Sequence, residues 1–330
     1  MSRGRFLAKR VLQTVFMLWL VLTFLFFFFR LLPGDFTDIM VYRGASEETI
    51  RAFRDNWGLN DPLHVQYMRY MVNFATGDVG TSLQFRTPVW QFVKMKIFNS
   101  FILVAPGITT AYLLGGIWGG FLGSKRGTNL EKWGLPPVVF LGAFPTFVTS
   151  IFLIIIFAGV FDLLPTSGMF GFATSSKFSG APWWRPYLTV DFGQHYILPF
   201  AAVLLRYAYL PVLIMRTSVV EVMGQGFFFY HRMTGLPGGQ RLRHLLKHAS
   251  LPLITLYPVS MTRAIGGLVL IEIVFNWPGI GFTLVQAVLS RDFPVVQFVF
   301  FLVAAFVIVA NFGVDVIYGI IDPRVSVGED

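Results

Sequence analysis

Six long apolar segments limit the possible folds of this chain more than any other feature. Each is long enough to cross the roughly 30 Å hydrocarbon core of a bilayer as a helix. They cover residues 11–29, 98–122, 136–160, 197–215, 251–274 and 295–317. The sequence therefore predicts an all-α membrane protein with six transmembrane helices and a small extracytoplasmic helical insert after the first.

The composition supports a membrane location. Hydrophobic residues make up 55% of the chain and charged residues 13%, whereas soluble domains are about a quarter charged. The absence of cysteine excludes disulfides, thiolate nucleophiles and cysteine-ligated metals. The net charge of +9 comes largely from bases that flank the apolar segments, so it indicates membrane topology rather than binding to nucleic acid.

Basic residues also predict the orientation of the chain. Four bases within residues 3–10 precede the first apolar segment, so we expect a cytoplasmic N-terminus. This segment is long and no small-residue cleavage site follows it, which favours a transmembrane helix over a signal peptide. The same rule predicts a cytoplasmic C-terminus, with Lys125 and Arg241 inside and Arg43 and Ser179 outside.

The predicted organisation has three parts. Residues 1–30 form an N-terminal arm and the first transmembrane helix, residues 31–97 form the insert, and residues 98–330 form the main transmembrane domain with a cytoplasmic loop at 217–250. Within the insert, Ser46 is a predicted N-cap of a helix that ends near Gly58, and a second helix opens after Pro62. The insert is too small to form an independent domain with a large core.

Two transmembrane segments have unusual features. Ala111, Gly115, Gly119 and Gly123 recur every four residues, a spacing that lets helix backbones approach closely in lipid. Pro145 interrupts the third segment and predicts a kinked helix beside a cavity or a neighbour.

The longest polar stretch in the C-terminal half covers residues 221–252. A run of aromatic residues precedes a Gly-Pro-Gly turn, and a basic amphipathic helix with Leu242, Leu245 and Leu246 on one face follows it. This helix is suited to an anionic membrane surface. The aromatic helix needs a groove in which to bury its rings, which suggests docking of a cytoplasmic protein. The alternative is an ordinary loop.

Several kinds of chemistry are absent from the sequence. It contains no Walker-type phosphate loop, no H-E-x-x-H and no G-x-S-x-G. His244 and His248 are four residues apart, but no carboxylate is near enough in sequence to complete a metal site. We therefore expect no catalytic residue, no bound cofactor and no metal in this chain.

Two arginines lie about halfway along predicted spans, Arg206 in the fourth and Arg263 in the fifth. A mid-membrane arginine costs at least about 2.5–3.5 kcal/mol on insertion scales, so it normally faces a polar cavity or a partner. We expect that at least one lines a solute path, together with Pro145, and favours anionic or strongly hydrogen-bonding solutes. The alternative is a structural arginine at a subunit interface.

Several motifs point to a known family. They are LLPGD after the first span, WGLNDPLHVQYMRYM, GDVGTSL at residues 77–83, the stretch at 272–297 and IDPR near the end. With these motifs the chain resembles the permease subunits of bacterial dipeptide/oligopeptide-type ABC importers. The resemblance implies a multi-pass protein of the cytoplasmic (inner) membrane. It also implies a second homologous permease, one or two cytoplasmic ATPases that bind ATP and Mg²⁺, and an extracytoplasmic solute-binding protein.

In such permeases a short coupling helix before the fifth span docks on the ATPase. The matching residues are Phe227, Phe228, Phe229, Tyr230, His231, Arg232, Gly235 and Leu236. Tyr230 and His231 stand where the family usually has small residues, Thr234 replaces a base and Gly226 replaces an acid, which leaves the ATPase partner open. Peptides are the default solute, and oligosaccharides, nickel chelates or opines are the alternatives. A stand-alone carrier or membrane enzyme is disfavoured, because only the second half carries the docking loop.

Overall fold

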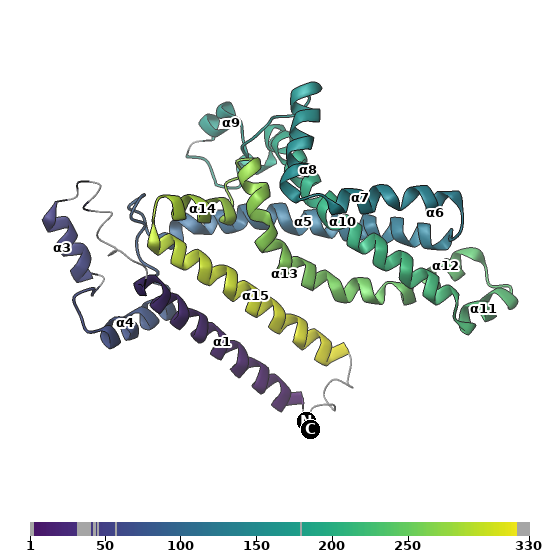
Figure 1. Cartoon of the computed structure of the whole chain (residues 1–330), viewed down its shortest axis with the longest axis horizontal. Helices are drawn as coiled ribbons and strands as arrows, with labels where there is room; N and C mark the ends of the chain where they lie inside the picture. The colour runs from purple at the N-terminus through teal and green to yellow at the C-terminus, as the bar shows by residue number, and fades with distance from the viewer. Residues whose placement is uncertain are drawn as a thin grey trace. The chain divides into compact units, whose positions relative to one another are not determined.

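The computed structural model describes residues 3–31, 41, 44, 46–56, 58–178 and 180–321 (Figure 1). Within these ranges the chain is helical, and the extended backbone is limited to an isolated bridge between Thr81 and Pro88. The structure does not describe three of the predicted topology markers. They are Arg43 and Ser179, which were predicted to be extracytoplasmic, and the tail after residue 321, which was predicted to be cytoplasmic.

The chain divides into two compact units. The terminal unit contains residues 1–96 and 283–330, and the central unit contains residues 97–282. Residues 283–330 therefore group with the N-terminal part, although the rest of the main transmembrane domain separates the two in sequence.

The terminal unit is built on two long antiparallel helices that lie side by side (Figure 1). Aromatic rings of α4 pack on both of these long helices, α1 and α15. The ring centres of Phe26 on α1 and Tyr67 on α4 are 5.2 Å apart, and those of Phe74 on α4 and Phe301 on α15 are 5.3 Å apart. The helices of this unit are α1 (Arg3–Leu31), α3 (Glu47–Asn56), α4 (Leu63–Thr76) and α15 (Phe293–Ile321), with the first turns of α5 (Val89–Ser124) and most of α14 (Ile280–Leu289).

The two predicted helices of the insert are confirmed. The Ser46 hydroxyl accepts a hydrogen bond from Thr49 N at 3.3 Å, and α3 begins at the next residue, as an N-cap requires. α4 begins after Pro62 and ends at Gly77, whose φ of +83° is the left-handed conformation that favours glycine at a helix end.

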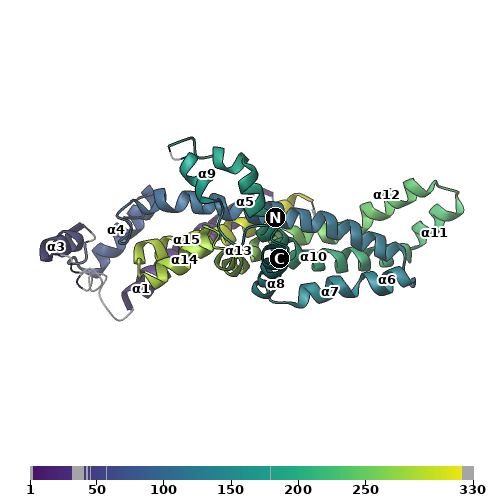
Figure 2. The ribbon, with the colours of Figure 1, turned by 90° about the horizontal axis from the view of Figure 1, so that it is seen from above.

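The central unit is organised around α10, which contacts α7, α8, α12 and α13. The Thr189 hydroxyl caps α10 by accepting from Phe192 N at 3.1 Å. The other helices are α6 (Asn129–Gly134), α7 (Pro136–Ala143), α8 (Thr146–Leu153), the π-helix η1 (Ile154–Val160), α9 (Phe172–Lys177), the 3-10 helix η2 (Arg185–Leu188), α10 (Val190–Met223), α11 (Gly226–Met233), α12 (Gly238–Ala249) and α13 (Leu251–Val274). Figure 2 shows α6, α11 and α12 at the same end of this unit.

The stripe of small residues on α5 lies directly against α10. A Cβ on Gly119 would be 2.3 Å from the carbonyl oxygen of Val212, and one on Gly123 would be 2.7 Å from that of Arg216. Ala111 on the same stripe is fully buried. The predicted close helix packing is confirmed, because no larger side chain fits between these two backbones.

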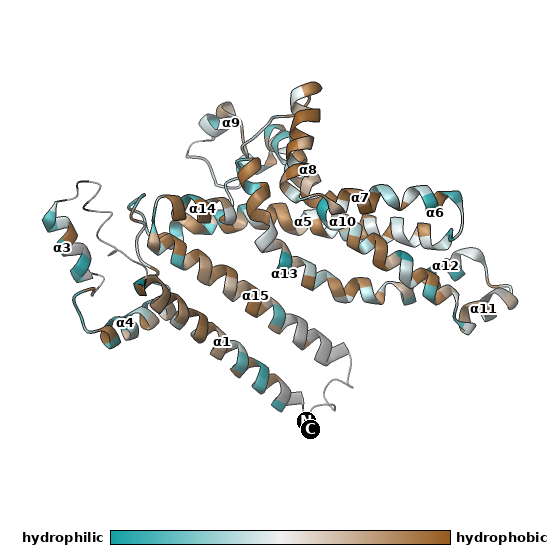
Figure 3. Ribbon diagram, in the orientation of Figure 1, coloured by the Kyte–Doolittle hydropathy of each residue, from teal (hydrophilic) through white to brown (hydrophobic). Residues whose placement is uncertain are grey.

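The helices that could span a membrane coincide with the apolar segments of the sequence. Among the described residues, four helices are long and apolar enough to cross a membrane, and there are up to six if each of two bent helix pairs counts as one span. Figure 3 shows hydrophobic residues over most of α8 and α15, whereas hydrophilic residues gather on α3, α6 and α12.

The predicted kink at Pro145 needs correction, because the helix is broken there. α7 ends at Ala143, α8 begins at Thr146, and the two segments meet at 105°. Proline has no N–H to continue the helix and disfavours helical backbone in the residue before it. Accordingly Phe144 has extended dihedrals, φ −71° and ψ 141°.

Candidate functional site

The connection at residues 221–252 forms a helical hairpin at one end of α10. Phe227 and Phe228 of α11 pack against a small core of α10 and α12 that contains Met215, Val219 and Leu245. The Phe227 ring also lies 5.0 Å from the imidazole of His248. These two phenylalanines therefore attach α11 to the central unit rather than extend from it.

The rest of the aromatic run faces outward. The side chains of Phe229 and Tyr230 are 63% and 67% exposed, and Met233 one turn later is 72% exposed. Leu236 is half-buried, and the side chains of His231 and Arg232 are not described. Within the predicted run of eight residues, Phe229 and Tyr230 therefore present exposed aromatic side chains, whereas Phe227 and Phe228 are packed.

The turn after α11 depends on the backbone of Gly235. Its φ is +71°, and a Cβ built there would meet no atom within 4 Å. The constraint on this position is therefore conformational rather than steric, because residues with a side chain rarely adopt a positive φ.

α12 is amphipathic, as predicted, and its neighbours cover only part of its leucine face. Leu245 and Leu246 pack on the core that α10 and α12 share, whereas the side chain of Leu242 is 48% exposed. The predicted face was drawn from spacing alone, and spacing does not reveal how much of a short helix its neighbour covers.

The two candidate path arginines lie among tyrosines in the central unit. The guanidinium carbon of Arg206 on α10 is 5.8 Å from the ring centre of Tyr207 and 5.6 Å from that of Tyr209. The Arg263 side chain on α13 is exposed and near the Tyr112 hydroxyl. Neither arginine pairs with an acid in the part of the chain that the structure describes, so aromatic faces and hydroxyls are the groups that meet these charges.

Hydroxyl groups join α5 to α13 beside these arginines, and sequence reasoning did not identify them. The hydroxyls of Tyr112 and Ser260 are 2.5 Å apart, and those of Thr109 and Tyr257 are 2.7 Å apart. Tyrosine and threonine within otherwise apolar spans were the available signal. The buried Tyr112 and Ser260 hydroxyls satisfy each other, so these pairs hold α5 against α13.

A buried carboxylate organises the stretch 272–282. Glu272 is fully buried, and it accepts hydrogen bonds from Ser100 Oγ at 2.5 Å and Phe282 N at 2.8 Å. Trp277 is equally buried and donates its indole N–H to the carbonyl of Asn99 at 2.9 Å. The hydrogen bonds to a charged acceptor hold this turn rigidly against α5.

A second buried carboxylate, that of Asp292, holds a loop in place in the terminal unit. Asp292 is 1% exposed and accepts from the Ser82 hydroxyl, from Leu83 N at 3.1 Å and from Gln84 N at 3.2 Å. It therefore binds the GDVGTSL loop, which lies more than 200 residues away in sequence.

These features define a multi-pass helical membrane protein with a helical hairpin whose aromatic side chains are partly exposed. Residues 111–327 match the family described as the binding-protein-dependent transport system inner membrane component, and residues 3–96 match the N-terminal part of such membrane components. The chain belongs to this family of transport-system membrane components.

Individual relatives match along nearly the whole chain. A probable peptide ABC transporter permease of Sinorhizobium fredii is 30% identical over 324 residues, which cover 98% of this chain and 99% of the relative. A glutathione transport system permease of Salmonella typhimurium is 30% identical over 97% of this chain and 98% of its own length. An oligopeptide transport system permease of Bacillus subtilis is 29% identical over 97% of this chain and 99% of its own length.

The predicted resemblance is confirmed by these matches. The chain is a multi-pass inner-membrane component of an ABC transport system and a transport subunit rather than an enzyme. A system of this kind includes ATPase and solute-binding partners.

Proposed function

We propose that this chain is the permease subunit of an ATP-driven importer and forms half of the translocation path for peptides, or a similar small solute, delivered by a binding protein. The near full-length match to permeases named for peptide, glutathione and oligopeptide transport carries this proposal.

The proposed assembly contains a second homologous permease, one or two cytoplasmic ATPases that bind ATP and Mg²⁺, and an extracytoplasmic binding protein. The chain crosses the membrane six times, with each bent helix pair as one span, and both termini are cytoplasmic. The bases of residues 3–10 and of the turn at 125–132 support this orientation. Residues 31–97 are then the extracytoplasmic insert.

The proposed docking element for the ATPase is the exposed face of α11. Phe229 and Tyr230 are free to enter an apolar groove, while Phe227 and Phe228 bind α11 to α10 and α12. Movement of α11 by the ATPase is therefore transmitted to α10, the central helix of its unit, as a rigid-body displacement.

The test of this element compares substitutions on the two faces of α11. Phe229→Asp is expected to abolish co-purification of the ATPase with normal membrane insertion, because a desolvated unpaired charge costs several kcal/mol in an apolar groove. Gly235→Trp is expected to act similarly by disturbing the turn. The matched control is Phe172→Asp in α9, since the Phe172 side chain is also highly exposed, at 90%. Normal ATPase binding by Phe229→Asp would contradict the docking role.

The proposed solute path uses Arg206, Arg263 and the break at Pro145. The tyrosine and hydroxyl groups around the two arginines support this role, because they provide hydrogen-bond partners within otherwise apolar helices. Carboxylates and other strongly hydrogen-bonding groups suit a guanidinium, whose planar fork donates two bonds at once.

Arg206→Gln and Arg263→Gln test the path by uptake and by complex yield. A path residue is expected to lose uptake at normal yield. Arg216→Gln is the matched control on α10, because Arg216 pairs with Glu131 through two nitrogen donors and should mainly affect yield. If the two test variants lose yield but keep uptake per complex, both arginines are interface residues.

Two further experiments test whether the chain works in a complex and which class of solute the complex transports. Purification from membranes is expected to recover ATPases and the second permease with this chain, whereas a stand-alone carrier or enzyme would be active alone. Ligands bound by the cognate binding protein then distinguish peptides from oligosaccharides, nickel chelates and opines.

A further inference from the structure

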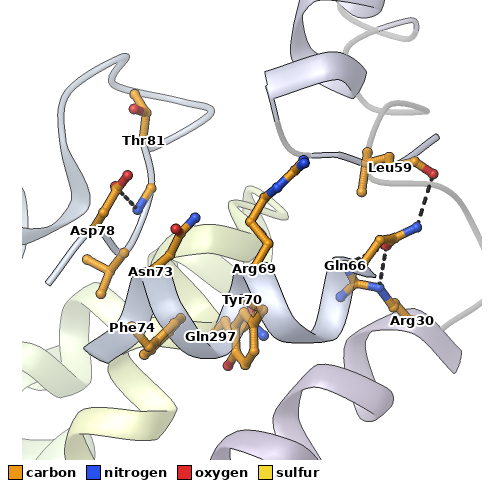
Figure 4. A pocket seen from close by; sticks show the side chains of 12 residues that line it. Arg30, Leu59, Gln66, Arg69, Tyr70, Asn73, Phe74, Asp78, Thr81 and Gln297 are labelled. Atoms are coloured by element: carbon orange, nitrogen blue, oxygen red, sulfur yellow. Dashed lines mark hydrogen bonds between the residues drawn. The ribbon is translucent and has the colours of Figure 1, made fainter. Parts of the chain in front are cut away.

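A cavity of about 300 Å³ lies in the terminal unit, between α4, the outer end of α1 and the start of α15 (Figure 4). This volume is at the lower end of the range for small-molecule sites, roughly 300–1,000 Å³. Its walls combine apolar side chains, such as Phe74 and Val79, with charged and amide side chains. The transport mechanism proposed above does not use it.

Arg30 is held at one side of the cavity in a fixed orientation. Its Nε and Nη2 atoms donate to Gln66 Oε1 at 2.9 and 2.7 Å, and its guanidinium stacks on the Phe26 ring at 3.8 Å. Gln66 is itself oriented, because its amide nitrogen donates to the carbonyls of Leu59 and Asp61 at 3.2 and 2.8 Å. The third nitrogen of Arg30, Nη1, makes no hydrogen bond with a residue that the structure describes, which leaves it for another acceptor.

The positive charge of Arg30 has no acid partner among the described residues. Gln66 holds it but is neutral. The acids nearby have other partners: Asp61 pairs with Arg69 at 2.9 Å, and Asp78 accepts from Gly80 N at 3.2 Å. A half-buried guanidinium without a counter-charge is unfavourable unless an anion reaches it.

Two further donors face the same cavity. Gln297 on α15 is 4% exposed, and its amide lies close enough to the hydroxyl of neighbouring Tyr70 to interact with it. Apart from that mutual contact, neither the Gln297 amide nitrogen nor the Tyr70 hydroxyl makes a hydrogen bond of ordinary geometry within the described ranges. Burial raises the pKa of Tyr70 well above its usual range, so its hydroxyl stays protonated and can donate. Buried polar groups are normally satisfied, so unused donors at a cavity wall indicate a missing acceptor.

We propose that this cavity binds the carboxylate of a small organic acid, through the free nitrogen of Arg30, the hydroxyl of Tyr70 and the amide of Gln297. Among the described residues, two arginines and one acid line the cavity, and Arg69 is already paired with Asp61 while Asp78 accepts from Gly80 N. Arg30 and the two neutral donors therefore match a planar monoanion, which accepts through two oxygens. The apolar wall at Phe74 and Val79 receives the aliphatic part of the molecule.

The experiment measures binding to the purified complex without its binding protein, so that solute delivery does not contribute. The probes are N-acetyl-L-alanine, its neutral amide N-acetyl-L-alaninamide, and inorganic phosphate, followed by ligand-observed NMR. N-acetyl-L-alanine is expected to bind at least tenfold more tightly than either comparison probe. Equal binding of acid and amide, or tighter binding of phosphate, overturns the proposal.

Variants then locate the site. Arg30→Gln and Gln297→Leu are each expected to weaken binding of N-acetyl-L-alanine at least tenfold. Gln297→Leu keeps the test decisive if Arg30→Gln does not fold, because removal of an unsatisfied buried amide should leave thermal stability unchanged or higher. The matched control is Arg51→Gln in α3, since Arg51 is exposed and pairs with Glu47 outside the cavity. Binding unchanged by Gln297→Leu contradicts the assignment.

Discussion

The contact between α5 and α10 predicts that glycine-to-alanine substitutions on α5 destabilise the protein, and that the loss is larger where the two backbones are closer. In Gly119→Ala the new Cβ would lie 2.3 Å from the carbonyl oxygen of Val212, whereas ordinary contact begins at 3.4 Å. The obstacle is backbone, which cannot rotate away. The two helices must therefore separate locally by about 1 Å, and such a gap removes a quarter to a half of each dispersion contact across it.

The size of the effect follows from two opposing contributions. Overpacking of this kind typically lowers the free energy of unfolding by about 1–3 kcal/mol. Replacement of a helical glycine by alanine raises it by up to about 1 kcal/mol, because alanine has the higher helix propensity. We expect a net loss of about 1–2 kcal/mol, which corresponds to a fall of several degrees in Tm. Gly123→Ala and Gly115→Ala should be milder, because their nearest backbone oxygens are at 2.7 and 2.9 Å.

The assay heats the detergent-solubilised protein and measures the remaining monodisperse fraction by size exclusion, with intrinsic tryptophan fluorescence for detection. The matched control is Gly193→Ala, a helical glycine of α10 whose added Cβ would meet no atom within 4 Å. It should retain the wild-type Tm or exceed it. If Gly119→Ala is as stable as Gly193→Ala, the proposed steric limit between α5 and α10 is wrong.

Three other predictions concern buried carboxylates and topology. Asp292→Ala leaves the Ser82 hydroxyl and two backbone N–H groups without their acceptor, so we expect a loss of about 2–3 kcal/mol and faster limited proteolysis of the loop at 81–88. Glu272→Gln keeps the volume but weakens two charge-assisted hydrogen bonds, and it should lower Tm while a Glu272→Ala variant lowers it further. In a chain without cysteine, Lys177→Cys should react with an impermeant thiol reagent from outside and Arg241→Cys should not; the reverse pattern would invert the proposed orientation.

The sequence by itself determined the features that depend on local rules. Apolar length predicted the helices, since a bilayer requires backbone hydrogen bonds within each segment. Ser46 caps the start of its helix, and that helix ends at Asn56, close to the predicted Gly58, whose φ of +60° suits a chain reversal; both are properties of a few neighbouring residues. The four-residue spacing of Gly115, Gly119 and Gly123 predicted a close helix contact, although it did not name the partner helix.

Only the tertiary structure decided which side chains face a neighbour and which are exposed. The aromatic run looked uniform in sequence, yet Phe228 packs on α10 and α12 while Phe229 is exposed, because the position of α11 beside those helices selects the face. Arg30, Gln66 and Gln297 form one cavity wall from three distant segments, and Asp292 meets Ser82 across 210 residues. Such pairings depend on long-range packing of helices, and sequence spacing carries no information about that packing.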